Sequence, residues 1–287
     1  MAKCGAQRAS RRRDRPILVP GSVWRAELAL KLGDIRLAVD DLVVGNPARN
    51  ADYPDGPGAS DNEQRAWGMD FHKGLGLEFF LYNSRMSKFV HLHTHSHYSL
   101  LQALPKVPEL VAKAKADGAE ALALTDAGNM YGTIEFYKEC RAQKIKPIIG
   151  VDFYVAARTR KDREPRIDNR RTRLVLLAKN IDGYKNLLKL VTYSHLEGFY
   201  YRPRIDKELI EKYHEGLVAI SPSFSGEIAQ AIRNGNEELA KEWTKFYKNI
   251  FGEDFYLEIT AHPEMENHGA LMERLAGFAR TEKAEIV

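Results

Sequence analysis

Four histidines alternate along the short stretch HLHTHSHYS, residues 91 to 99: His91, His93, His95 and His97. In an extended strand alternate side chains point to one face, so these imidazoles are expected to lie together. Imidazole is a ligand for zinc, iron and manganese in proteins. The pattern favours a metal site over a row of solvated or core-lining histidines, although that structural reading would be the better one for any single histidine.

Acidic side chains stand where other strands are expected to end. Asp152 lies inside the apolar run PIIGVDFYV, and an ionised carboxylate buried there needs a cation, unless it faces solvent near the strand end. Asp126, in TDAGNMYG, is equally well explained as a loop cap or as part of a site. In FYLEITAHPE, His262 is a candidate ligand and Glu258 is its alternative.

One stretch of the chain is strongly basic. RTRKDREPRIDNRRTR, residues 158 to 173, has eight Arg or Lys residues against three acidic ones. Such a loop either contacts phosphate groups or is simply solvated, and both interpretations stay open. The chain has no Gly-rich phosphate-binding loop and no GxSxG motif, which argues against a P-loop nucleotidase or an α/β-hydrolase.

Composition describes a globular chain. The 287 residues are 44% hydrophobic, which is enough for the core of one large domain or two small ones, and the net charge of +4 is too small to establish nucleic-acid binding. Cys4 and Cys140 are the only cysteines, so a disulfide framework and a four-cysteine zinc site are excluded. No apolar run approaches the roughly 20 residues of a membrane-spanning helix. We expect no membrane contact and a cytoplasmic location.

The elements that would position these residues are predicted to follow Met86. Residues 1–85 are rich in Arg, Gly, Pro and Asp and predict a poorly structured, non-globular leader or a mis-assigned upstream start. Residues 86–287 alternate between strands and helices. Strands are expected at 89–95, 121–125, 147–156, 173–178, 217–220, 255–260 and 284–287. Helices are expected at 107–117, 133–143, 184–194, 227–233, 237–250 and 268–281. This order predicts an α/β fold, a parallel barrel truncated at its C-terminal end.

Longer motifs in residues 86–287 resemble one family. HLHTHSHYSLL, ALTDAGNMYGTIEFYKEC, KPIIGVDFYVA, LLAKNIDGYKNLLKLV, EGFYYRPRID and ISPSFSGEIAQAI are similar, in this order, to the N-terminal PHP (polymerase and histidinol phosphatase) domain of bacterial DNA polymerase III alpha subunits. The resemblance implies a PHP-type distorted (β/α)7 barrel whose strand ends hold up to three metal ions for phosphoester hydrolysis.

The resemblance also implies site residues. It assigns the metal-ligand positions to His93, His95, Asp152 and His262, and it leaves His91, Asp126 and Glu258 as supporting residues. Three ligand positions depart from the family, since Gln102 replaces an Asp, and Ala127 and Arg173 replace histidines. Arg173 brings a fixed positive charge that opposes a cation. We therefore predict a weakened or lost centre, with a single zinc, manganese or iron ion retained at most.

The function that the resemblance implies belongs to a longer chain. That parent protein would be a DNA-directed DNA polymerase that uses magnesium and replicates the chromosome, and its catalytic carboxylates and DNA-binding residues would lie outside this sequence. Its partners would be DNA and deoxynucleotides, a proofreading exonuclease subunit and the sliding clamp. The barrel itself would have a structural or exonuclease-docking role. The alternatives are an active metal-dependent 3′–5′ exonuclease or phosphoesterase in the barrel, and a stand-alone histidinol-phosphatase-like enzyme.

Overall fold

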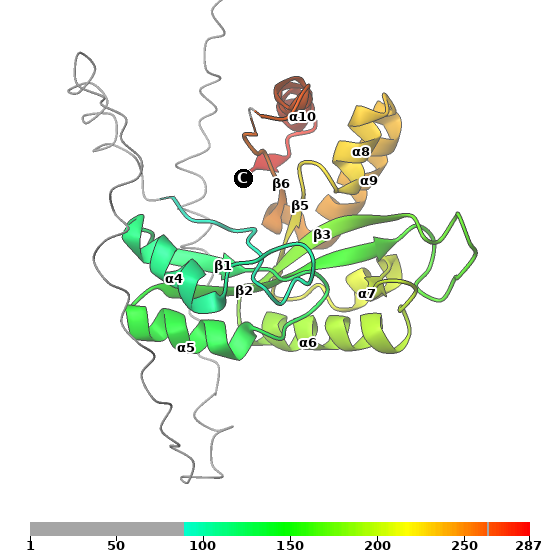
Figure 1. Ribbon diagram of the computed structural model, residues 1–287. Helices are drawn as coiled ribbons and strands as arrows, with labels where there is room; N and C mark the ends of the chain where they lie inside the picture. Colours follow the sequence, from blue (N-terminus) through cyan, green and yellow to red (C-terminus); the bar gives the residue numbers. More distant parts are fainter. Residues whose placement is uncertain (1–88, 263) are drawn as a thin grey trace, which may run out of the picture.

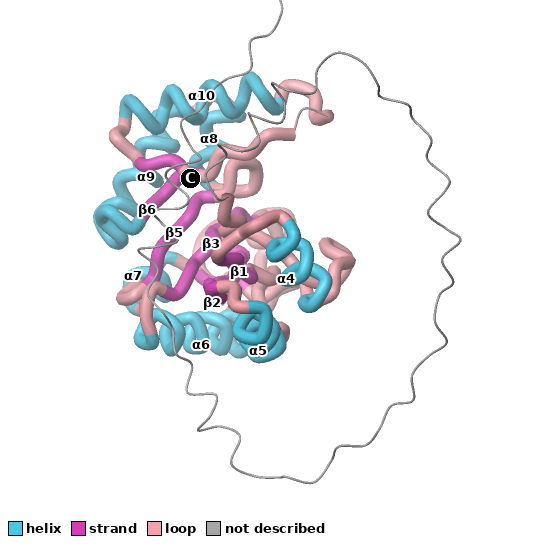
Figure 2. The backbone as a smooth tube through the Cα atoms, turned by 90° about the vertical axis from the view of Figure 1, so that its left-hand side faces the viewer, coloured by secondary structure: helices cyan, strands magenta, loops and turns pink. Residues whose placement is uncertain are grey.

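Figure 1 shows the chain as a computed structural model, which describes residues 89–262 and 264–287. The predicted leader at residues 1–85 and the boundary near Met86 lie outside the described residues and stay predictions. The described part is a curved sheet with helices packed against its outer face (Figures 1 and 2).

The sheet has seven strands in the order β1-β2-β3-β5-β6-β7, with β4 paired to β2. Their bounds are β1 (Ala121–Leu124), β2 (Lys146–Ala156), β3 (Arg171–Ala178), β4 (Arg204–Ile205), β5 (Leu217–Ser221), β6 (Phe255–Leu257) and β7 (Glu285–Ile286). The α/β half-barrel is confirmed, but the prediction of an all-parallel sheet is wrong, because β3 runs antiparallel to both β2 and β5. The reason is local: the segment that joins β2 to β3 contains no helix, whereas the crossover between parallel strands usually carries one.

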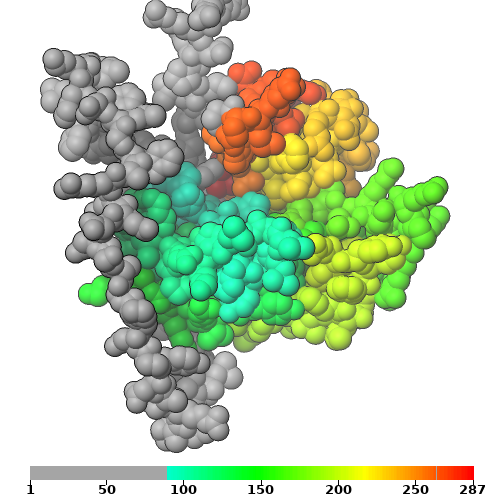
Figure 3. Space-filling model, viewed as in Figure 1, coloured from blue at the N-terminus to red at the C-terminus, as the bar shows by residue number. Residues whose placement is uncertain are grey.

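Seven α-helices lie in the described ranges. They are α4 (Val107–Ala116), α5 (Thr133–Gln143), α6 (Ile181–Leu196), α7 (Lys207–Lys212), α8 (Glu227–Arg233), α9 (Glu237–Phe251) and α10 (His268–Thr281), with a short 3₁₀ helix η1 (Gly252–Asp254). In Figure 3 the helices α8, α9 and α10, coloured from yellow to orange-red, form a lobe above the cyan and green part of the molecule. The six predicted helices are confirmed, while α7 and β4 are too short to give a periodic signal.

Side chains of the long strand β2 alternate between two hydrophobic clusters. Ile149 and Val151 face the helices, whereas Ile148 belongs to a second cluster on the inner face of the curved sheet. The same alternation directs Asp152 toward the inner face. On β3 it directs Arg173 there as well, two residues before the inner-face Val175. The inner face is therefore apolar along most of its length and polar at one end, where the candidate site lies.

The prediction of a regular strand at residues 89–95 is wrong. The segment runs beside β1, and the carbonyl of His91 accepts a hydrogen bond from the N–H of Ala123 at 2.9 Å. The chain then bends at Leu92 and His93. This bend breaks the alternation, so the four histidines do not share one face.

Candidate metal centre

Three of the predicted ligands come together at the polar end of the inner face. The ligand atoms of His93, His95 and Asp152 all lie within 4.8 Å of one another. Asp152 Oδ2 is 3.2 Å from His93 Nε2 and 3.1 Å from His95 Nε2. Asp152 is buried, while the two histidines are half-buried. Strand β2 positions the carboxylate, and the bend at residues 92 and 93 turns the first imidazole toward it.

Glu258 holds His93 from the opposite side. His93 Nδ1 lies 2.9 Å from Glu258 Oε1, and the other oxygen of Glu258 accepts a hydrogen bond from the backbone N–H of Ser223 at 3.0 Å. Burial alone would lower the pKa of His93, but the carboxylates of Glu258 and Asp152 together raise it to about 10. Without a metal, His93 is therefore a cation at neutral pH, and a metal ion must displace its proton.

Arg173 forms a salt bridge with the carboxylate of Asp152. Its Nη2 lies 2.5 Å from Asp152 Oδ2, the oxygen that both histidines approach, and it also donates a hydrogen bond to Gln102 Oε1 at 3.1 Å. Burial would raise the pKa of Asp152, but hydrogen bonds from His93 and His95 and the charge of Arg173 hold it well below its usual range. The sequence predicted that the charge of Arg173 opposes metal binding, and in the structure Arg173 does so by pairing directly with Asp152.

The donors still fit one metal ion by type. Two imidazoles and one carboxylate suit zinc or iron, and Asp152 Oδ1 is buried without a hydrogen-bond partner, as a free ligand atom would be. Within the described ranges no other group of three His, Cys, Asp or Glu side chains is close enough to hold an ion. Ala127 offers no ligand beside Asp152, to which it is joined by a β-bridge. The geometry therefore accommodates one ion in competition with Arg173.

Asp126 has another role in this structure. The carboxylate is buried and accepts hydrogen bonds from the Ser96 N–H at 2.7 Å, the Ser96 hydroxyl at 2.8 Å and the Ser99 hydroxyl at 2.6 Å. These bonds fasten the segment that follows His95 to the end of β1. Asp126 thus supports the site through the backbone, and its oxygens point to the loop.

His262 lies outside the group of three. Its side chain is 49% exposed, and its Nδ1 is 3.1 Å from Glu264 Oε1. It lines a cavity of about 340 Å³ together with His93 and Glu258. The structure therefore places His262 next to the candidate centre without bringing it to Asp152.

The two outer histidines of the motif also point elsewhere. His91 is exposed, and its ring meets the edge of Phe89 with the centroids 4.6 Å apart. His97 packs on Tyr98 with the ring centroids 4.2 Å apart.

Sequence reasoning missed Tyr154 and Ser223. The hydroxyl of Tyr154 accepts a hydrogen bond from Gln102 Nε2 at 2.8 Å, and its ring lies under Arg173 with 4.3 Å from the guanidinium carbon to the ring centroid. Its place two residues after Asp152, on the same face of a strand, was the available signal. Ser223 binds Glu258 from a loop, so no periodic pattern marks it.

An open groove leads to the histidines. A cavity of about 640 Å³ is lined by His93, His95, Gln102 and the segment from Ala103 to Pro105. A substrate or partner segment can therefore reach the imidazoles from solvent.

Comparison with known proteins identifies the class of this domain. Residues 91–262 match the sequence profile of the PHP domain, and the chain belongs to this family. Within the family it is similar to DNA polymerase III subunit alpha. It is 45% identical to that protein of Borreliella burgdorferi over 195 residues, which are 68% of this chain and 17% of the relative. The protein of Aquifex aeolicus is 45% identical over 190 residues, 63% of this chain and 16% of the relative. The chain thus spans about a sixth of the length of these relatives.

Among solved structures, an amidohydrolase from Chromobacterium violaceum is similar, with a TM-score of 0.45 and 13% identity over 69% of this chain and 84% of that chain. In the part of the chain that the structure describes, no helix is both long and apolar enough to cross a membrane.

Proposed function

We propose that this chain is the PHP region of a DNA polymerase III alpha subunit, whose whole length synthesises DNA with magnesium during chromosome replication in the cytoplasm. The support is sequence identity of 38% to 45% with such subunits across about two thirds of the chain. Similarity to polymerases favours this role over a stand-alone histidinol-phosphatase-like enzyme. DNA, deoxynucleotides, a proofreading exonuclease subunit and the sliding clamp are the proposed partners.

For the domain itself we propose a weakened metal centre in a scaffold that braces the polymerase. The observation that carries this proposal is the 2.5 Å contact between Arg173 and Asp152. A divalent ion would have to displace the guanidinium from Asp152 and the proton from His93, and both steps oppose binding. An ion held by His93, His95 and Asp152 would supply Lewis-acid chemistry for phosphoester hydrolysis.

An exposed apolar loop supports a docking role. Leu100, Leu101 and Leu104 are 71%, 100% and 91% exposed, in the segment whose later residues line the groove beside the histidines. Exposed apolar side chains gathered in one short loop are typical of protein interaction sites. We propose that this loop contributes to binding the exonuclease subunit.

Calorimetric zinc titration of the 287-residue chain tests the weakened centre. Arg173→His removes the competing charge and adds an imidazole, so its zinc affinity should exceed that of the unchanged chain by at least about tenfold. Arg171→His is the matched control, since it adds a histidine nearby and leaves the ion pair of Arg173 intact. Tight stoichiometric zinc binding by the unchanged chain, equal to that of Arg173→His, would refute the proposal.

A second candidate is a metal-dependent 3′–5′ exonuclease or phosphoesterase. The open groove at His93 and His95 favours it, because a phosphoester could reach the three donors there. Release of nucleotides from 3′-labelled single-stranded DNA, dependent on added metal and abolished by His95→Ala, would support it. Metal-independent release, or release that persists in His95→Ala, would exclude it.

A further inference from the structure

The basic stretch 158–173 divides into two parts in the structure. Arg158 pairs with Glu164 and Asp168, and Arg160 pairs with Glu197, Asp206 and Glu208. These cations hold the loop that joins β2 to β3, which projects at the edge of the molecule (Figure 1). Throughout the described residues, by contrast, no carboxylate forms a salt bridge with Arg170, Arg171 or the neighbouring Arg202. Their charges are available to a ligand.

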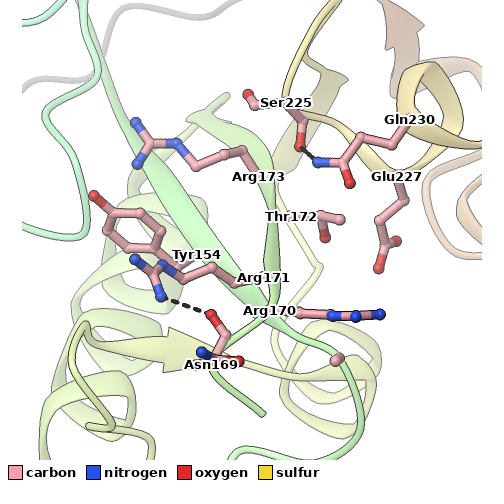
Figure 4. Close-up of a pocket in the computed structure, with 10 residues that line it drawn as sticks. Tyr154, Asn169, Arg170, Arg171, Thr172, Arg173, Ser225, Glu227 and Gln230 are labelled. Carbon is pink, nitrogen blue, oxygen red and sulfur yellow. Dashed lines mark hydrogen bonds between the residues drawn. The ribbon is translucent and has the colours of Figure 1, made fainter. Parts of the chain in front are cut away.

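Two of these free arginines line a pocket between β3 and the start of α8 (Figure 4). Its volume is about 650 Å³, and its lining includes Arg170, Arg171 and Arg173. Figure 4 shows Tyr154 and Arg173 on one side and Glu227 and Gln230 on the other. The backbone joins the two sides, because the N–H of Arg173 donates to the carbonyl of Ser225 at 3.0 Å.

Three guanidinium groups form cation–π contacts with the ring of Tyr154. The guanidinium carbons of Arg171, Arg173 and Arg202 lie 5.5, 4.3 and 5.9 Å from the ring centroid of Tyr154. Each cation is attracted to the ring but repelled by the other two. A bound anion would relieve that repulsion.

The pocket has little negative charge of its own. Glu227 is the one carboxylate among the residues that line it. Burial raises the pKa of Glu227, although a hydrogen bond from the Tyr247 hydroxyl at 2.6 Å opposes the rise. Arg173 is paired with Asp152, so Arg170 and Arg171 face the single carboxylate of Glu227 and leave an excess of positive charge in the pocket.

We propose that this pocket binds a backbone phosphate of single-stranded DNA. Guanidinium groups match the oxygens of phosphate in both charge and geometry, and Arg170, Arg171 and Arg173 line this pocket. Arg173 lines the pocket and donates a hydrogen bond to Gln102, which lines the open groove at the histidines, so a strand could pass from one to the other. The choice of DNA over other phosphate carriers rests on the proposed replicative function.

Fluorescence anisotropy with a labelled oligothymidylate of roughly 12 nucleotides tests the proposal on the whole chain. Arg170 is exposed, so Arg170→Glu should fold normally, and it should weaken DNA binding about tenfold and flatten the dependence of affinity on salt. Arg163→Glu is the matched control, because it reverses an exposed charge in the same loop outside the pocket. The control should change affinity by less than about twofold.

Several results would overturn the inference. The first is no DNA binding at about 50 mM salt. The second is an equal loss of DNA affinity in both variants. The third is Arg170-dependent binding of inorganic phosphate or a phosphopeptide that is as tight as the binding of the DNA. A melting curve for each variant checks folding, and Arg171→Gln replaces Arg170→Glu should the latter unfold. Zinc titration of each variant in the absence of DNA tests the metal centre separately, so failure of DNA binding is distinguishable from failure of the proposed metal centre.

Discussion

Asp126 illustrates how a single residue can serve the site without touching it. Replacing it with Ala should destabilise the chain by about 2–4 kcal/mol, because the buried donors of Ser96 and Ser99 would lose their acceptor. Urea unfolding measures the loss, and Asp182→Ala, at an exposed position in α6, is the control. A loss no larger than that of the control would show that water replaces the carboxylate.

Only part of the site was predictable residue by residue. The strand pattern and the family motif predicted His93, His95 and Asp152, because ligand types at fixed sequence spacing are visible without a structure. The contact between His93 and Glu258 was not predictable, since 165 positions separate the two residues and their meeting depends on the curvature of the sheet. The expectation that all four histidines share one face was mistaken, because a bend at residues 92 and 93 leaves no periodic mark.

At the scale of elements, Arg204 fixes the loop between β2 and β3. It is fully buried and donates hydrogen bonds of 2.9 to 3.0 Å to the backbone carbonyls of Arg160, Asp162, Asp168 and Gly198. This accounts for the second arginine of GFYYRPRID.

Arg204→Met should therefore destabilise the chain by about 3–5 kcal/mol, because four carbonyls would lose their donor. The loop should also become sensitive to limited proteolysis. Arg202→Met, in the same motif and only partly buried, is the matched control and should leave unfolding nearly unchanged. Similar unfolding midpoints for the two variants would contradict this role.

The same loop should make the free energy of unfolding depend on pH. The hydrogen bonds from Arg158 lower the pKa of Asp168 below its usual value of 3.8, against the effect of burial. A carboxylate whose pKa is lower in the folded state than in the unfolded state stabilises the chain at pH values above its unfolded-state pKa. That contribution is lost as the pH falls through its folded-state pKa. Asp168→Asn should thus destabilise the chain at neutral pH and reduce the loss on acidification. Unfolding followed from pH 7 to about pH 3 measures both effects, and an unchanged acid slope would refute the assignment.

Elements differ in how much of them a sequence reveals. Helices such as α4 were predictable because Val107, Val111 and Ala114 repeat at helical spacing on a buried face. The antiparallel direction of β3 was not predictable. An alternating βα order was expected, but the loop between β2 and β3 carries no helix.

At the scale of the whole molecule, Arg173 connects the two sites. It pairs with Asp152 in the candidate metal centre and lines the proposed phosphate pocket. A ligand that draws the guanidinium toward the pocket frees Asp152 for a metal ion, and by linkage a bound ion favours that ligand equally.

Saturating oligothymidylate should therefore tighten zinc binding by about five-fold or more, within the usual range of coupling between sites. Calorimetric titration with and without the oligonucleotide measures the factor. Because a bound polyanion also attracts cations through space, Arg173→Gln is the control: its zinc affinity should be high in both conditions and change less on adding DNA. A coupling factor that is equal in the unchanged chain and in Arg173→Gln would mean that Arg173 does not transmit the effect.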